Sequence, residues 1–154
     1  MHGDWVQALL NRRTQICARW SALLQIERAT TALAHPDMLI HLLDGTFAAI
    51  IQALEPTSKR DDVAAAPASA TRPDCPCGRS PYRHFFIAGE QAWLEALVLI
   101  QVALPKLEAG ARDQAVAELL NVIRALARVE VEAFCAVCQY RTAALRAATG
   151  AARV

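Results

Sequence analysis

Four of the five cysteines in this 154-residue chain form two closely spaced pairs, and thiols are the side chains most suited to chemistry here. Cys75 and Cys77 flank a proline in a polar segment rich in Pro, whereas Cys135 and Cys138 lie in a helical pattern, with 57 residues between the pairs. A loop and a helix that each present two thiols can converge on one tetrahedral metal ion or one redox centre. The sequence therefore predicts a shared four-thiol site, with zinc as the expected metal and an iron–sulfur cluster as the alternative.

The spacing within each pair bears on this prediction. Cys135 and Cys138 are three residues apart, so on a helix they would share a face. The Cys75-Pro76-Cys77-Gly78 turn is one residue tighter than the usual zinc-binding turn, although Pro and Gly favour a sharp chain reversal. A purely structural interpretation stays open for the second pair, because free cysteine is among the most buried residue types. In that case no cofactor is bound.

Basic residues near the loop pair favour a redox role as well. Positive charge lowers the pKa of a thiol and raises its thiolate fraction, and Arg72, Arg79, Arg83 and His84 surround the pair in sequence. His84 could also replace one thiolate as a metal ligand. Cys17 falls on an apolar helix face and is interpreted as packing.

A second candidate site rests on charged residues in apolar stripes. Arg13, Glu90 and Glu130 interrupt otherwise apolar helix faces, and buried charges are usually paired. Arg13 could bridge to Glu90 or Glu130, or line a small-ligand pocket with Glu90 and Trp93.

The elements that must position these residues are helical. Apolar residues recur at intervals of three and four, and no alternating strand pattern appears. The predicted helices cover residues 5–28, 36–55, 81–105 and 111–148. We expect one all-α domain over residues 1–154, either a four-helix bundle or a globin-like packing.

An irregular segment interrupts the helices at about residues 56–81. Its Ala, Pro, Ser, Thr and Asp content cannot bury enough apolar area to hold a fixed shape unaided. Residues 56–80 are therefore expected to form a flexible insert that carries the Cys75–Cys77 turn.

Composition excludes several function classes. Sixteen Lys and Arg balance fifteen Asp and Glu, which gives a net charge of +1 and no basic field for nucleic acid. The longest uncharged stretch, 96–105, is shorter than the roughly 20 residues of a membrane span. The familiar catalytic motifs are missing from the sequence, so we expect no enzyme. Paired cysteines without a secretory leader indicate the reducing cytoplasm.

Scattered residues at both ends resemble a family of signalling domains. The first helix carries Arg12, Arg13 and Trp20, the second begins at Pro36, and the last region carries Cys138, Tyr140, Arg141 and Arg146. These features resemble the helical N-terminal sensory domains of stressosome co-antagonist and related bacterial signalling proteins. The resemblance implies a non-catalytic module that forms a homodimer or binds a protein partner. We therefore expect a sensory module in which a metal or redox link at the cysteines orders or releases the loop.

Overall fold

The computed structural model describes residues 2–26, 35–55, 71–104 and 108–138, and within these ranges every regular element is a helix. In chain order the elements are α1 (His2–Asn11), α2 (Arg13–Ile26), α3 (Pro36–Leu39), the 3-10 turn η2 (Ile40–Leu42), α4 (Leu43–Leu54), α5 (Pro81–Ala103) and α6 (Ala109–Val137). The all-α fold class expected from the sequence is confirmed.

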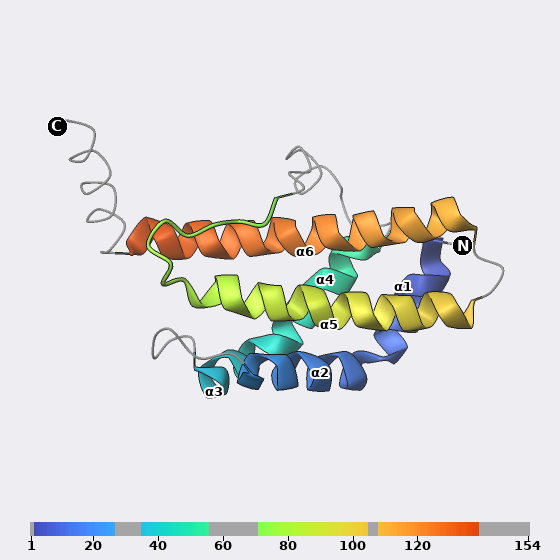
Figure 1. Cartoon of the computed structure of the whole chain (residues 1–154), viewed down its shortest axis with the longest axis horizontal. Helices are drawn as coiled ribbons and strands as arrows, with labels where there is room; N and C mark the ends of the chain where they lie inside the picture. The colour runs from blue at the N-terminus through green and yellow to red at the C-terminus, as the bar shows by residue number, and fades with distance from the viewer. Residues whose placement is uncertain (1, 27–34, 56–70, 105–107, 139–154) are drawn as a thin grey trace.

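Helix α5 is the centre of the bundle. It lies between α2 and α6 in one layer and runs antiparallel to both, while α1 and α4 cross behind this layer at a steep angle (Figure 1). Helix α5 contacts α1, α2 and α6, and α4 closes the back by contacting α2 and α6. Side chains on several faces of α5 are therefore buried.

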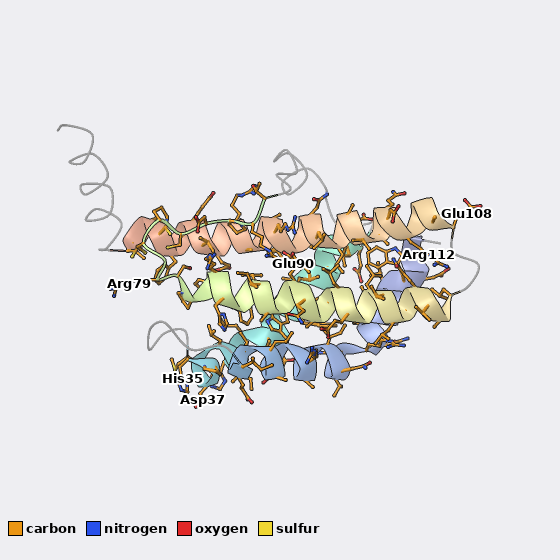
Figure 2. The ribbon with its side chains drawn as sticks, in the orientation of Figure 1. His35, Asp37, Arg79, Glu90, Glu108 and Arg112 are labelled. Atoms are coloured by element: carbon orange, nitrogen blue, oxygen red, sulfur yellow. The ribbon has the colours of Figure 1, made fainter. Side chains whose placement is uncertain are left out.

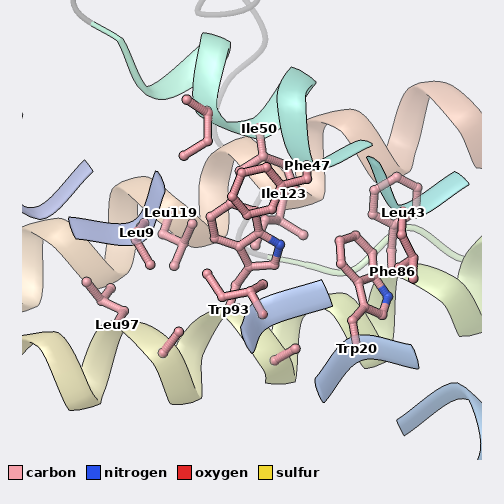
Figure 3. Close-up of a cluster of buried hydrophobic side chains, with 14 of the residues drawn as sticks. Leu9, Trp20, Leu43, Phe47, Ile50, Phe86, Trp93, Leu97, Leu119 and Ile123 are labelled. Carbon is pink, nitrogen blue, oxygen red and sulfur yellow. The ribbon is translucent and has the colours of Figure 1, made fainter. Parts of the chain in front are cut away.

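Two tryptophans organise the hydrophobic core. Trp93 of α5 is fully buried and stacks on Phe47 of α4, with ring centroids 4.7 Å apart (Figure 3). Trp20 of α2 is also fully buried, and its Nε1 donates to the carbonyl oxygen of Phe85 at 2.9 Å. A Cβ on Gly89 would lie 2.6 Å from Cε2 of Trp20, so only glycine allows this close approach of α2 to α5.

The first predicted helix, 5–28, is wrong as a single element. It divides at Arg12 into α1 and α2, which run in different directions (Figure 1). Residues 11–15 are all polar, so no core contact holds a straight helix across them. Leu10, expected in the core stripe, is 39% exposed.

The second predicted helix begins where expected. His35 is the N-cap, and its Nδ1 accepts a hydrogen bond from the Asp37 amide at 3.4 Å, with Pro36 in the first turn (Figure 2). The unpredicted 3-10 turn at 40–42 separates α3 from α4. The expected core stripe is buried throughout: Leu39, Leu43, Phe47, Ile50 and Leu54.

The third predicted helix, 81–105, matches α5 closely. The fourth predicted helix, 111–148, extends beyond the observed end of α6. Helix α6 stops at Val137, and Cys138 has an extended backbone with φ −74° and ψ 115°. Residues 139–148 lie outside the described ranges. Val137, expected in the core, is 83% exposed. The buried residues of α6 recur every four positions: Ala115, Leu119, Ile123, Ala127, Val131 and Cys135.

Residues 71–80, here called the strap, connect the irregular segment to α5. The strap contains no regular helix and runs along α6 before it turns into the start of α5 (Figure 1). The remainder of the expected insert, 56–70, lies outside the described residues. The strap is therefore the part of the insert that can be placed against the bundle.

Two helical stretches are long and apolar enough to cross a membrane, by length and composition alone. From the length of the uncharged stretch 96–105, no such helix was expected. The two stretches are Pro36–Leu54, with a mean hydropathy of 1.3, and Pro81–Ala103, with 1.4. The criterion of length and composition tolerates isolated charges such as Glu90, which is why α5 meets it. Within the bundle, 61% of the tested window of α5 is buried, as in a core helix.

Candidate thiol centre

The structure brings four thiols together at one end of the α5–α6 pair. Cys75 Sγ lies 3.2 Å from Cys135 Sγ and 3.2 Å from Cys77 Sγ, and Cys77 Sγ lies 3.5 Å from Cys138 Sγ. All four are free cysteines. The two pairs singled out by their spacing in the sequence thus form one continuous chain of sulfur contacts.

A tight turn presents the first pair. The Gly78 amide donates to the Cys75 carbonyl oxygen at 2.9 Å, and Gly78 has φ +66°. Proline at the second position and a glycine with positive φ at the fourth are suited to this reversal. Asp74 fixes the entry, because its Oδ1 accepts a hydrogen bond from the Cys75 amide at 2.9 Å. The strap therefore delivers two thiols over a span of three residues.

The end of α6 presents the second pair, but not from one helix face. Cys135 lies in the last turn of α6 and is buried, whereas Cys138 follows the helix with an extended backbone. The expectation that both cysteines sit on a helix is corrected accordingly. Because the chain has left the helix at Cys138, its thiol reaches Cys77 while Cys135 contacts Cys75.

Apolar side chains surround the sulfurs. Cys75 is 3% exposed and Cys135 7%, and both pack in a small cluster with Val131. Tyr82 and Phe134 pack against this cluster and meet edge to face, with ring centroids 6.5 Å apart. This shell keeps water from the two buried thiols and strengthens electrostatic effects among them.

Three of the thiols, those of Cys75, Cys77 and Cys135, have shifted pKa values. Burial raises the pKa of Cys75, but hydrogen bonds from the Cys77 and Cys135 thiols and from the Ser80 and Cys77 backbone amides outweigh it and bring the pKa to about 7. Burial, and then the hydrogen bond to Cys75, raises the pKa of Cys135 to about 12. Burial and the contact with Cys75 also raise the pKa of Cys77. Among these three thiols of the metal-free cluster, Cys75 is therefore the one that most readily carries the negative charge.

The expected influence of the neighbouring arginines is not the cause of these shifts. Arg72 pairs with Glu90 at 2.9 Å, and Arg83 lies 3.6 Å from Asp74. Thiol and backbone donors, rather than guanidinium groups, lower the pKa of Cys75. Backbone N–H groups directed at a sulfur are the kind of support that a thiolate ligand needs.

The sulfurs are closer together than zinc ligands. Four thiolates about 2.3 Å from a tetrahedral zinc ion stand about 3.8 Å apart, compared with the observed 3.2–3.5 Å. In the described part of the chain, no group of three or more His, Cys, Asp or Glu side chains is arranged to hold a metal ion as it stands. A metal would therefore require these three contacts to lengthen by a few tenths of an ångström.

His84 lies in the first turn of α5 and is half-buried. The sulfur contacts link the four cysteines to one another, so the cluster reaches four thiols without an imidazole. Cys17 of α2 is half-buried against the main core, as its packing interpretation requires.

Arg13, Glu90 and Trp93, grouped as a possible ligand site from the sequence, have different neighbours in the structure. Arg13 pairs with exposed Asp44 at 3.0 Å and lies over the Phe47 ring, 5.6 Å from its centroid. Trp93 is sealed in the core. Neither residue has Glu90 among the partners described here.

Glu90 instead joins three segments. It lies between α5 and α6 (Figure 2), is 4% exposed, and accepts hydrogen bonds from Arg124 of α6 at 2.8 Å and from Arg72 of the strap at 2.9 Å. Burial raises its pKa, but the hydrogen bonds from Arg124 and Arg72 outweigh this and lower it. The position of Glu90 in an apolar stripe indicated that it would have a charged partner. The sequence did not indicate that the partners are Arg72 and Arg124.

No protein-family model, curated protein or solved structure matches this chain. The functional argument therefore depends on the thiol centre and on the contacts of the strap.

Proposed function

We propose that this protein is a non-catalytic regulatory or sensory helical module in which Cys75, Cys77, Cys135 and Cys138 bind one zinc ion. The metal attaches the strap to the end of α6. The observation that carries this proposal is the continuous sulfur chain across two segments 57 residues apart in sequence. Gain or loss of the metal would fix or release the strap, a transition between order and disorder.

The chemistry of the donor set favours a mononuclear ion over an iron–sulfur cluster. A cluster places several irons and sulfides between its cysteines and needs the thiolates spread apart, whereas these sulfurs lie within 3.2–3.5 Å of their neighbours. For a single zinc ion, these three sulfur contacts would need to lengthen by only a few tenths of an ångström. Zinc binding releases the thiol protons, so its affinity would increase with pH.

The setting of the proposed module is the cytoplasm, where thiols stay reduced. A net charge of +1 offers no attraction for nucleic acid or an anionic membrane surface. Its output would pass to a protein partner or to a second copy of the chain.

Elemental analysis of protein purified anaerobically, without a metal-affinity tag, tests the proposal. We expect one zinc per chain in the wild type and in Cys17→Ser, which replaces the one cysteine outside the cluster and keeps all four thiols of the site. Cys135→Ser is expected to lose the metal, and chelation should release four reactive thiols in the wild type. Equal metal content in Cys135→Ser and Cys17→Ser would refute the four-thiol assignment.

A reversible thiol switch is the second candidate, favoured by the Cys75 thiolate lying 3.2 Å from the Cys135 thiol. With a peroxide as oxidant, the Cys75 thiolate attacks one peroxide oxygen, the O–O bond breaks, the other oxygen leaves as hydroxide or alkoxide, and a sulfenic acid forms on Cys75. The Cys135 sulfur then forms the S–S bond, and water leaves with the sulfenic oxygen and the thiol proton. No metal and a peroxide-induced Cys75–Cys135 disulfide would support this function. If the protein binds no metal and its thiols are not reversibly oxidised, a structural helical adaptor is the remaining interpretation.

A further inference from the structure

The upstream part of the strap fills a groove between α5 and α6. Pro73 lines one small cavity together with Phe86 of α5 and with Ile123 and Ala127 of α6, and these last three are nearly fully buried. The remaining cavity at this place is only about 10 Å³. Arg72 and Pro73 therefore fit the groove closely.

The ion pairs at the groove indicate that the charge of Glu90 does not need Arg72 to balance it. Arg124 already neutralises Glu90, with two hydrogen bonds of 2.8 and 3.1 Å, and its side chain is only 18% exposed. Arg72 adds a second guanidinium and is 55% exposed. If Arg72 departs, a neutral Glu90–Arg124 pair remains, and such a pair avoids the cost of an unpaired buried charge.

A backbone contact accompanies these side-chain contacts. Arg128 of α6 donates from Nη2 to the Thr71 carbonyl oxygen at 3.4 Å. The groove thus contacts a main-chain carbonyl, a guanidinium and a proline ring from three consecutive residues. Contacts of these three kinds can hold an extended peptide segment by its shape, its charge and its main-chain polarity.

We propose that this groove is a peptide-binding site and that the strap occupies it as an intramolecular competitor. The partner it fits is an extended, exposed protein segment containing an Arg-Pro pair, whose guanidinium takes the position of Arg72 on Glu90. The control of access rests on the proposed function: the thiol centre tethers the strap at its downstream end. While tethered, the strap has a high effective concentration and excludes a free peptide.

The test uses a fluorescent peptide, Ser-Ala-Thr-Arg-Pro-Asp, copied from residues 69–74, and fluorescence anisotropy. The hosts are the full-length wild type, Cys75→Ser/Cys77→Ser, in which the tether is cut, and Arg72→Ala, in which the guanidinium position is vacated whatever the metal content. We expect both variants to bind the peptide more tightly than the wild type by about tenfold. The same peptide with Ala in place of Arg should bind the variants about tenfold more weakly.

Three results would each overturn the proposal that the groove binds a peptide. They are equal affinity for the two peptides, equal affinity of the wild type and Arg72→Ala for the Arg peptide, and no binding of the Arg peptide to a folded Arg72→Ala protein. Folding of each host is checked by circular dichroism and a cooperative thermal transition, and the Ala peptide keeps the comparison valid within one host. Because Arg72→Ala retains all four thiols, its metal content is measured in parallel. In Arg72→Ala, zinc without peptide binding would refute the groove alone, and peptide binding without zinc would refute the metal site alone.

Discussion

Arg124 on α6 donates to both carboxylate oxygens of Glu90 on α5, over 2.8 Å from Nη2 to Oε1 and 3.1 Å from Nε to Oε2. This bidentate pair joins the two longest helices beneath the strap. Glu90 is 4% exposed, so its charge depends on these partners rather than on water.

Glu90→Gln is expected to destabilise the protein by about 3 kcal/mol, because it leaves Arg124 without a full counter-charge in a buried site. Asp44→Asn is the matched control. It removes an exposed partner of Arg13 and should cost less than about 1 kcal/mol. Urea unfolding monitored by circular dichroism gives both values, and equal losses would contradict the burial argument.

Acid should weaken the fold through the same carboxylate. The hydrogen bonds from Arg124 and Arg72 outweigh burial and lower the pKa of Glu90. The contribution of Glu90 to the free energy of unfolding is therefore fully present above its pKa in the unfolded chain, about 4.3. This contribution is lost as the pH falls through the lower pKa of the folded protein. Urea midpoints measured from pH 6 to 2 should decrease below pH 4.3 in the wild type. Glu90→Gln should show a shallower decrease, and parallel curves would refute this assignment.

Gly89→Ala should destabilise the α2–α5 contact by roughly 1–3 kcal/mol, because the new methyl group would overlap the Trp20 ring. Gly45→Ala offers a control within α4, where an added Cβ meets nothing within 4 Å. There the loss of backbone freedom in the unfolded chain should give a gain of up to about 1 kcal/mol. Thermal unfolding of the two variants should thus move the transition in opposite directions.

Cys75 should be modified before Cys135 in metal-free, reduced protein, because both thiols are buried but differ in acidity. Its pKa of about 7 makes it largely thiolate at pH 8, whereas the pKa of Cys135 is about 12. Brief iodoacetamide treatment followed by peptide mass spectrometry should find Cys75 labelled with a midpoint near pH 7. Preferential labelling of Cys135 would contradict the hydrogen-bond pattern of the cluster.

The sequence was a good guide to elements with unbroken apolar periodicity. Helix α5 and the start of α3 were placed nearly to the residue, because proline marks both beginnings and the stripe is continuous. The division of the first helix at Arg12 was missed because periodicity continues across the polar residues while the backbone direction changes. The end of α6 was missed because the Ala-rich sequence after Cys138 is itself favourable to helix.

At the site, the spacing of the cysteines indicated which residues meet, but not how. The position of Cys138 beyond the helix depends on its backbone angles, and the acidity of Cys75 depends on amide groups that only the folded turn brings close. The partners of Glu90 could not be predicted from the sequence either, because nothing in the local pattern distinguishes Arg72 and Arg124 from the other arginines. Long-range pairing of charges is decided by packing and not by local pattern.

The extended backbone at Cys138 gives the thiol centre one more physical role. The last turn of α6 carries no basic residue, and its terminal amide contact, from Cys138 to the Cys135 carbonyl oxygen, is long at 3.4 Å. Carbonyl groups at such a terminus bear partial negative charge and invite fraying. A cation held by Cys135 and Cys138 would clamp this terminus in the way that a C-cap motif does in other helices, so hydrogen exchange in the final turn would report whether the metal is bound.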